Sequence, residues 1–542
     1  MNLVPLNPLN IMNTPIGITL KTGNFEIDRA FRIAVGDMLG NVIYYKSGIL
    51  ERPAPCLVAG LSYPDPWTRD ASFNTWSGAG LLMPEVMKNT LLSCLTRGDA
   101  AAGHGDGCFD VAGSQVPPEV LSISGQYWDR VIWAVGAWAY YRQNGDKEFL
   151  ELAFEAVTNS LPYLEENEWD EDHQLFRGGA CIADGLGAYG DLYSNVKKSG
   201  IFHWPELNPD KRHPKGAGLP LMALSSNCLY VESYRLLGLM ALELGREPDP
   251  HWEEMRRKVI SGIQTHLWDA EAGFFKVYCD PWDSSGNRQE CLGNCFALLF
   301  DVATEEQRSL VVKNQPFLAY GPPAVWPDYP RYAKANVPIQ SFPKGRDDIA
   351  AENLVLSRFP TIRNGLAGHG GIVWPLMMGL HGEVVLREGR ADLFERELRL
   401  MAEVFCRAVQ SPECVHPECG APGGAVVEVG GTPDTIERAA SCYRQTWSAT
   451  SYLRLILHGV FGMECRPDGL RFHPCLPEGI ECAELIGVPW RQALLHIEVR
   501  RSERRETHVE IDGRELPDGF LPAGLTGEHR IIVSIGGRAA VK

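Results

Sequence analysis

Two adjacent side chains of opposite charge, Arg69 and Asp70, follow a proline-rich turn at residues 63–66 and stand at the start of a long helical pattern. An arginine fork beside a carboxylate offers both donors and acceptors to a ligand that carries hydroxyl groups. Trp67 lies next to them and could stack on the face of a sugar ring. The same residues also suit a helix N-terminus with a surface ion pair, so their chemistry depends on the rest of the chain.

A glycine-rich segment at residues 178–191 carries Asp184, Tyr189 and Asp191. Glycines allow the backbone to approach a ligand closely, and an aspartate before a glycine is typical of a turn. Asp184 is therefore a candidate acid, with Asp191 and Glu206 as competing acids nearby. A solvated aspartate on a turn explains the same pattern without any chemistry.

Two further segments place aromatic and polar residues at helix starts. Residues 365–375 form a glycine-rich loop with His369 that leads to Trp374 and a proline, which suits a first helical turn. The loop lacks the pattern of a phosphate-binding or dinucleotide-binding motif, and Trp374 could be either core packing or a sugar platform. The other segment, residues 125–130, contains three residues that could contact a ligand or cap a helix: Gln126, Trp128 and Asp129.

The segment 413–420 combines Glu413 with two cysteines and a histidine between two long helical patterns. Its acids could simply be solvated. A metal site is conceivable, but the spacing matches no common zinc pattern, and we predict no metal. No GxSxG nucleophile elbow is present in the chain.

Composition restricts the classes of function. The net charge of −17, from 68 acidic and 51 basic residues, argues against binding of nucleic acid. Fifteen cysteines without a regular framework indicate reduced thiols of a cytoplasmic protein, and the first twenty residues lack a signal-peptide pattern. No apolar run is long enough to span a membrane. The oligomeric state cannot be predicted.

The 542 residues predict one large domain with a smaller appendage. Residues 1–24 suggest an irregular arm, and residues 167–226 a loop-rich stretch. Between residues 25 and 464 the apolar spacing predicts paired antiparallel helices. From residue 465 to 542 the spacing changes to the period of strands, with a turn at Asp512 and Gly513. Helices are expected at residues 80–97, 125–143, 147–165, 227–244, 250–267, 292–303, 371–388, 391–409 and 446–460, and strands at 493–499, 507–511 and 530–534.

In this order, the motifs resemble those of the (α/α)₆-barrel glycoside hydrolases around glucoamylases (family 15), trehalases (family 37) and family 63. Residues 67–70 resemble the Trp-x-Arg-Asp of glucoamylases, and residues 371–375 the Gly-x-Val-Trp-Pro of family 63 and trehalase-like enzymes. Residues 413–420 are similar to Glu-x-Tyr-Asn-Pro-x-Thr-Gly, from which positions 415, 416 and 419 depart. Residues 446–449 resemble the Thr-Trp-Ser-Ala that opens the last barrel helix.

The resemblance implies a mainly α fold, an (α/α)₆ barrel at residues 25–464, followed by a small C-terminal β domain. It implies an inverting hydrolase for an α-glucosidic or related small glycoside, with no cofactor. Glu413 would be the general base and Asp184 the general acid. Asp184 lies on the opposite side of its neighbouring glycine from the acid in the family motif. The implied substrate-binding residues are Trp67, Arg69, Asp70, Gln126, Trp128, Asp129, Tyr189, His369, Trp374 and Trp447.

Two other functions fit the same sequence. A glycoside phosphorylase on this barrel would use phosphate in place of water, and the loop 368–370 could be read as its phosphate site. A non-catalytic carbohydrate-binding barrel is the other alternative. The sugar, the linkage and the aglycone are not predictable from the sequence.

Overall fold

The structure is a computed structural model. It describes residues 17–97, 120–125, 127–181, 189–194, 201–282, 286–329, 371–423, 426–428, 436–438, 441–504, 506–516 and 518–536.

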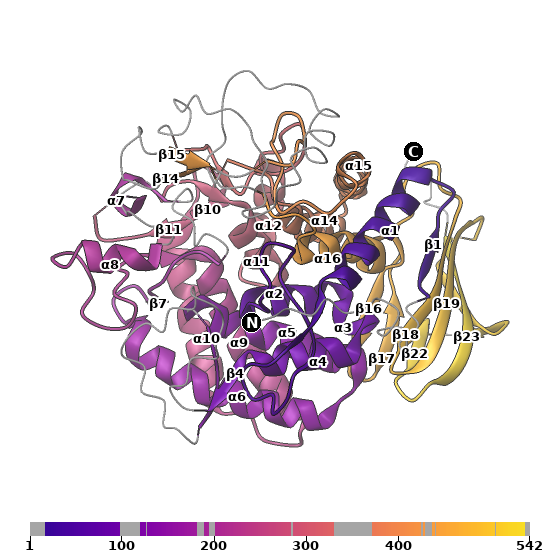
Figure 1. Cartoon of the computed structure of the whole chain (residues 1–542), viewed down its shortest axis with the longest axis horizontal. Helices are drawn as coiled ribbons and strands as arrows, with labels where there is room; N and C mark the ends of the chain where they lie inside the picture. The colour runs from indigo at the N-terminus through magenta and orange to yellow at the C-terminus, as the bar shows by residue number, and fades with distance from the viewer. Residues whose placement is uncertain are drawn as a thin grey trace.

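Six helices of the described chain contact one another in a closed order (Figure 1). Each of the six contacts the following member of this set, and the last member contacts the first. All or nearly all residues of α2, α14 and α16 and most of those of α9 are buried, so these helices lie inside the molecule. The six are α2 (Thr68–Asn74), α5 (Tyr127–Asn144), α9 (Leu224–Glu243), α11 (Cys291–Leu299), α14 (Pro375–Arg387) and α16 (Thr446–Arg454).

A second set of helices packs against this ring and keeps one face in solvent. In α15, the apolar residues Phe394, Leu398 and Met401 are buried, while the opposite face is charged, which is the pattern of an amphipathic surface helix. The set consists of α1 (Phe25–Gly40), α4 (Pro84–Ser93), α6 (Lys147–Glu168), α10 (Pro250–Gly262), α12 (Glu305–Asn314) and α15 (Ala391–Ala408). Shorter helical segments are η2 (Thr75–Ala79), α3 (Gly80–Leu82), α7 (Asp191–Ser194), η4 (Ile201–His203), α8 (Trp204–Leu207), η5 (Ile263–Leu267) and η7 (Leu455–Val460).

The helix expected at residues 80–97 is wrong in two respects. Met83 interrupts it, and a new helix, α4, begins at Pro84, because proline suits a first helical turn but not a helix interior. Its last residues form strand β4 (Leu95–Arg97), which pairs with β5 (Leu121–Ile123). Helix α12 was not expected from the sequence.

Two short hairpins share one construction. The first pairs β6 (Trp169–Asp170) with β7 (Leu175–Phe176), and the second pairs β9 (Trp268–Asp269) with β10 (Phe274–Phe275). Each is fixed to the next inner helix by an asparagine, since Asn227 and Asn294 accept from the backbone of the hairpin phenylalanine. The loop-rich stretch expected at residues 167–226 therefore includes the first of these hairpins.

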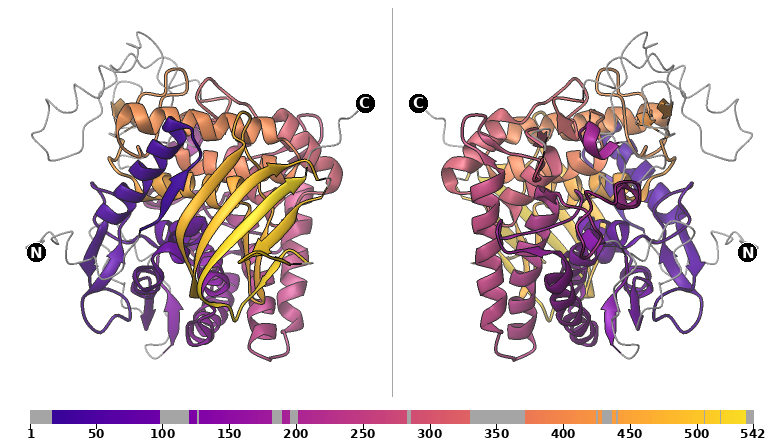
Figure 2. Two further views of the ribbon diagram at one scale, coloured as in Figure 1. Left: turned by 90° about the vertical axis from the view of Figure 1, so that its right-hand side faces the viewer. Right: turned by 90° about the vertical axis from the view of Figure 1, so that its left-hand side faces the viewer.

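The C-terminal residues form a mixed sheet in the order β1-β18-β19-β23-β20-β21, which lies over one side of the helices (Figure 2, left). Its strands are β18 (Cys482–Trp490), β19 (Gln492–Ser502), β20 (His508–Ile511), β21 (Arg514–Leu516) and β23 (Thr526–Gly536). A smaller sheet joins β16 (Met463–Arg466), β17 (Gly469–Phe472) and β22 (Phe520–Pro522). Strand β1 (Thr19–Lys21) pairs with β18, so this part of the expected irregular arm is a strand.

Further two-stranded pairs lie between the helices: β2 (Val42–Tyr45) with β3 (Ala54–Leu57), β8 (Met222–Ala223) with β11 (Tyr278–Cys279), β12 (Gln289–Glu290) with β13 (Val325–Trp326), and β14 (Val426–Glu428) with β15 (Ile436–Arg438). The cysteines of the described residues are free thiols, and most are buried. No helix in the described part of the chain has the length and apolar character to cross a membrane. Within those residues no group of three or more His, Cys, Asp or Glu side chains could hold a metal ion.

Candidate active site

Arg69, Trp374 and Trp447 meet at the starts of three inner helices. The guanidinium carbon of Arg69 lies 6.0 Å from the centre of the Trp447 ring. The rings of Trp447 and Trp374 meet edge to face, with centroids 5.8 Å apart. All three side chains are buried. The structure thus unites residues that lie more than 300 positions apart in the sequence.

Asp70 and Glu413 join the same cluster through the extended segment before α16. Gln445, the N-cap residue of α16, donates from Nε2 to Asp70 Oδ1 at 3.4 Å. The backbone N–H of Cys442 donates to Glu413 Oε2 at 2.7 Å, and the N–H of Glu413 donates to the Cys442 carbonyl. Backbone hydrogen bonds therefore hold the carboxylate of Glu413 in a defined orientation. We call Arg69, Asp70, Trp374, Glu413 and Trp447 the aromatic–acid cluster.

Local hydrogen bonds explain why the helix starts converge here. Thr68 Oγ1 donates to the Ser124 carbonyl, which ties the start of α2 to the segment before α5. Thr446 Oγ1 donates to the Val58 carbonyl at 2.6 Å and fixes the start of α16 against the loop that precedes Arg69. The loop packs closely at Gly60, because a Cβ there would lie 2.6 Å from Gln445 Oε1 and would displace that side chain.

A backbone bridge brings Glu413 toward Trp374. Val373 and Val415 exchange backbone hydrogen bonds at 3.2 and 2.8 Å. Since Val373 precedes Trp374, and Val415 follows Glu413 by two residues, this bridge holds the backbone next to both candidate residues together.

The electrostatics of the cluster are those of a buried acidic site. The pKa of the Cys442 thiol is raised to about 12, first by burial and then by the negative charge of Glu413, with a smaller contribution from Asp70. Cys442 therefore stays a neutral thiol and is no nucleophile at neutral pH.

The residues that flank the Asp184 segment are fixed near the start of α9. The Cys181 N–H donates to Ser225 Oγ at 2.9 Å, and the Ala180 N–H donates to Tyr189 Oη at 2.8 Å. The second bond joins the two sides of the segment 182–188. Asp184 itself lies outside the described residues.

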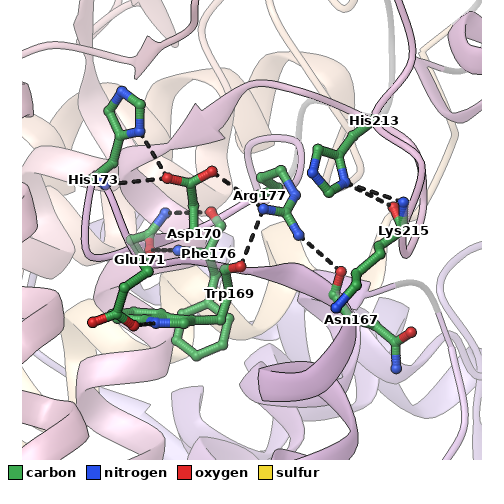
Figure 3. A network of polar contacts seen from close by, with 10 residues as sticks. Asn167, Trp169, Asp170, Glu171, His173, Phe176, Arg177, His213 and Lys215 are labelled. Carbon is green, nitrogen blue, oxygen red and sulfur yellow. Dashed lines mark hydrogen bonds and ion pairs between the residues drawn. The ribbon is translucent and has the colours of Figure 1, made fainter.

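A network of polar contacts fixes the backbone of hairpin β6–β7, which precedes this segment (Figure 3). Arg177 donates to Asp170 at 3.2 Å and to the carbonyls of Trp169 and Asn167. Burial opposes ionisation of Asp170, but hydrogen bonds from His173 and the charge of Arg177 hold its pKa below the usual value. The charged pair stabilises hairpin β6–β7 and so fixes where the next residues leave it.

The other predicted site residues lie as follows. Trp67 is half-buried at the N-cap of α2. Tyr189 is fully buried in an aromatic group with Tyr193 and Tyr278. Asp191 is exposed at the start of α7, and Glu206 is exposed beside His203. Trp128 and Asp129 are in the first turn of α5, and their side chains lie outside the described part; Gln126 and His369 lie outside it altogether.

Two residues of this region were missed by sequence reasoning. Gln445 directly precedes the Thr446–Trp447 helix start, which was a usable signal. Glu290, the residue before α11, is fully buried, and its carboxyl lies near Ser225, which favours the ionised form. Burial is the largest influence and raises the pKa of Glu290 to about 8. No sequence motif marks Glu290, because the neighbour that affects its carboxyl, Ser225, belongs to a different helix, α9.

A family model described as the mannosylglycerate hydrolase MGH1-like glycoside hydrolase domain matches residues 63–432, which is more than half of the chain. The chain belongs to this family. It is a glycoside hydrolase of the α/α-barrel group. A second model, the C-terminal domain of glycosyl hydrolase family 65, matches residues 463–516 of this glycoside hydrolase.

Solved structures show a similar fold at low identity. The GH63 mannosylglycerate hydrolase from Thermus thermophilus in complex with glucose is 15% identical, with a TM-score of 0.53, over 79% of this chain and 99% of that one. A sialidase is 13% identical, with a TM-score of 0.62, over 92% of this chain and 40% of that one. A GH78 rhamnosidase of Bacillus sp. GL1 is 14% identical, with a TM-score of 0.50, over 96% of this chain and 44% of that one. The chain thus spans less than half of these last two proteins. No curated protein matches the sequence.

Proposed function

We propose that this glycoside hydrolase is an inverting enzyme that cleaves a small α-linked glycoside with two carboxyl groups, Glu413 as general base and Asp184 as general acid. The observation that carries the proposal is the position of Glu413 in the aromatic–acid cluster. There a buried, backbone-oriented carboxylate lies with an arginine, an aspartate and two tryptophans. Such a set can bind sugar hydroxyls and stack on a sugar ring while a carboxylate activates water.

The scaffold proposed for this chemistry is an (α/α)₆ barrel. Its support is the closed order of contacts among the six inner helices and the outer helices packed on them. Loops at one end of such a rigid ring can hold catalytic groups in fixed relation. The division into a barrel at residues 25–464 and a β domain at 465–542 remains a prediction.

The proposed reaction needs the two carboxyl groups on opposite sides of the scissile bond. In inverting enzymes they stand roughly 6.5–9.5 Å apart, which leaves room for the attacking water. The acid must remain protonated near neutral pH, and burial among aromatic residues raises a carboxyl pKa. The residues that flank Asp184 fit this requirement, since Tyr189 and Cys181 are fully buried.

The substrate class is proposed from the family. Its description names mannosylglycerate, so this glycoside is the first compound to test, followed by α-glucosides. Reduced, cytoplasmic surroundings are proposed because the cysteines of the described residues are free thiols.

The test is a substrate screen followed by ¹H NMR of the first sugar released. Inversion of an α-glycoside should give the β-anomer before mutarotation. Glu413→Gln should lower kcat by a factor of about 10² or more with little change in KM, the usual effect of losing a general base. Asp184→Asn should do the same, but less for substrates with very good leaving groups, which need little proton donation.

The matched control is Glu418→Gln, because Glu418 is exposed in the same loop and should be replaceable without loss of rate. Full activity of Asp184→Asn would move the acid role to Asp191 or Glu206. Sugar phosphate formed in phosphate buffer would identify the alternative phosphorylase. Saturable sugar binding without turnover would identify a non-catalytic barrel.

A further inference from the structure

A polar cavity lies at the far end of the inner helices from the aromatic–acid cluster. Its volume is about 620 Å³. Helix α14 begins next to Trp374 of the cluster and ends with Glu383 and Arg387 in the cavity wall, and α16 likewise leads from Trp447 to His458 of η7. The end of α5 and the first strand of the C-terminal sheets, β16, complete the wall. This cavity is therefore separate from the proposed active site.

Arg142, in the last turn of α5, lines this cavity without any side-chain hydrogen bond or ion pair from the described residues. Its Nε is fully buried and has no partner among them. The guanidinium is not needed to cap its own helix, because the Arg142 carbonyl already accepts from Arg491 Nη2 at 3.2 Å. Burial lowers the pKa of Arg142, and the negative charge of Glu232 offsets this effect only in part.

The groups around Arg142 leave an excess of positive charge. The carboxylate of Glu383 accepts from Arg454 Nε at 2.7 Å and forms an ion pair with Arg387. It also lies 3.3 Å from His458 Nδ1, but burial lowers the pKa of His458, so this ring is neutral at pH 7. Arg454 is itself fully buried, and its Nη2 has no partner in the described part of the chain. This local excess occurs in a chain whose net charge is −17.

The other acid of the wall does not remove the excess. Glu464 of β16 pairs with His473 at 3.3 Å, and both side chains are largely exposed. A pair at that position is screened by solvent, which weakens its interaction with the partly buried guanidinium of Arg142. The cavity thus presents donors for which the residues that the structure describes supply no acceptor.

We propose that this cavity is a binding site for a phosphate-class oxyanion, free or carried on a small metabolite, with Arg142 as its main ligand and Arg387 beside it. A guanidinium fork matches the geometry of phosphate oxygens and binds two of them at once. Several bases around one carboxylate favour a divalent anion over a single carboxylate. The volume lies in the range of sites for small molecules, so a sugar phosphate has room to bind.

The ligand would join two parts of the molecule. Arg142 and Arg387 belong to inner helices, whereas Cys465 and Glu464 of the wall belong to β16. Binding is therefore expected to stabilise the folded protein against heat, by linkage between ligand binding and unfolding.

The experiment measures thermal unfolding and isothermal titration of the full chain with inorganic phosphate, glucose 6-phosphate and glucose. Phosphate should raise Tm in a saturable way, and glucose should not. Tighter binding of glucose 6-phosphate than of phosphate identifies a phosphate ester as the ligand, and equal binding identifies free phosphate. Arg142→Met should weaken phosphate binding at least tenfold, whereas Arg32→Met, a change at an exposed arginine of α1, should leave it unchanged.

Two further readouts keep the test decisive. Without phosphate, Arg142→Met should be at least as heat-stable as the parent protein, because an unpaired buried charge has been removed. Arg387→Gln, at a side chain that is 56% exposed, should fold normally and weaken phosphate binding several-fold. The proposal is overturned if the parent protein shows no saturable phosphate binding, if Arg142→Met binds as tightly as the parent, or if its Tm falls markedly without ligand.

Discussion

At the scale of single residues, Glu290 shows how burial decides the state of a side chain. Its carboxyl is fully buried before the start of α11, and Ser225 next to it partly offsets the effect of burial on its pKa. Ser225 Oγ in turn accepts from the Cys181 N–H beside the Asp184 segment. Because burial raises the pKa of Glu290 to about 8, the residue is mainly neutral at pH 7. It therefore acts as a neutral positioning group for the chain that leads to the proposed acid.

This state makes folding stability depend on pH. Between the ordinary pKa of 4.5 and about 8, Glu290 is protonated in the folded chain but ionised in the unfolded chain. The unfolded state then binds fewer protons, so stability falls as pH rises through this window, by about 1.4 kcal/mol per unit. Glu290→Gln should reduce this fall, measured as the free energy of urea unfolding at pH 5, 6.5 and 8. Glu306→Gln, at an exposed site, is the control; equal slopes in all three proteins would contradict the assignment.

A second residue-scale prediction concerns the aromatic pair. Trp447→Leu removes the ring that contacts both Arg69 and Trp374. An aromatic contact of this kind contributes about 0.5–1.5 kcal/mol beyond area burial, so kcat/KM should fall by a factor of about 2–10. Trp447→Phe should retain part of the effect. The exposed Trp282 offers the control Trp282→Leu, and an unchanged kcat/KM in Trp447→Leu would remove Trp447 from the site.

Residue types and short motifs singled out Arg69, Asp70, Trp374, Glu413 and Trp447, and the structure brings these residues into one cluster. Their roles in binding and catalysis stay predictions. Residue types and motifs were not sufficient for Glu290, since its properties arise from Ser225 and from burial that only the packed fold creates. The role of Asp184 stays a prediction, because it lies outside the described residues.

At the scale of elements, close helix packing depends on small residues at the contact. Gly379 of α14 faces Ser451 of α16, and a Cβ at position 379 would lie 2.6 Å from the Ser451 Cβ and 2.8 Å from its carbonyl oxygen. Two inner helices therefore approach each other at a point where even a methyl group does not fit.

Gly379→Ala should lower the free energy of unfolding by about 1–3 kcal/mol, because overpacking forces the two helices apart. Gly238→Ala is the matched control within α9, where a Cβ would have no atom within 4 Å. That change should stabilise the protein by about 0.4–1 kcal/mol, since alanine loses less entropy than glycine on folding. Denaturant unfolding of both variants checks the sign, and a stable Gly379→Ala protein would refute the packing.

Elements with a clear period were predictable, and those set by local chemistry were less so. The apolar spacing indicated α6, α9, α10, α14 and α15 near their observed positions. The break at Met83 and the short hairpins were missed, because strands of two residues are too short to show a period.

At the scale of the whole molecule, strand β1 joins the N-terminal part of the chain to the C-terminal sheet. This strand of three residues forms the edge of the large C-terminal sheet, beside β18. Leu20 is buried, while its neighbours Thr19 and Lys21 are exposed. Contacts that link such distant parts of a sequence cannot be read from local patterns, which is why the first residues were expected to be irregular.

Leu20→Asp should strongly lower Tm, because it buries a charge in the sheet and weakens the β1–β18 pair. Thr19→Asp places the same charge one residue earlier on the exposed face and should change stability by less than about 0.5 kcal/mol. Thermal unfolding monitored by circular dichroism compares the two. Equal Tm values would mean that β1 contributes nothing to the stability of the sheet.

The common direction of the inner helices also has an electrical consequence. The starts of α2, α14 and α16 meet at the aromatic–acid cluster, and the ends of α5, α14 and η7 meet at the Arg142 cavity. Each helix carries about half a positive elementary charge at its start and half a negative one at its end. Their dipoles therefore add, which makes the first end favourable for negatively charged groups. An anion at the other end has to be held against the same field, and this is why a single guanidinium would not suffice there.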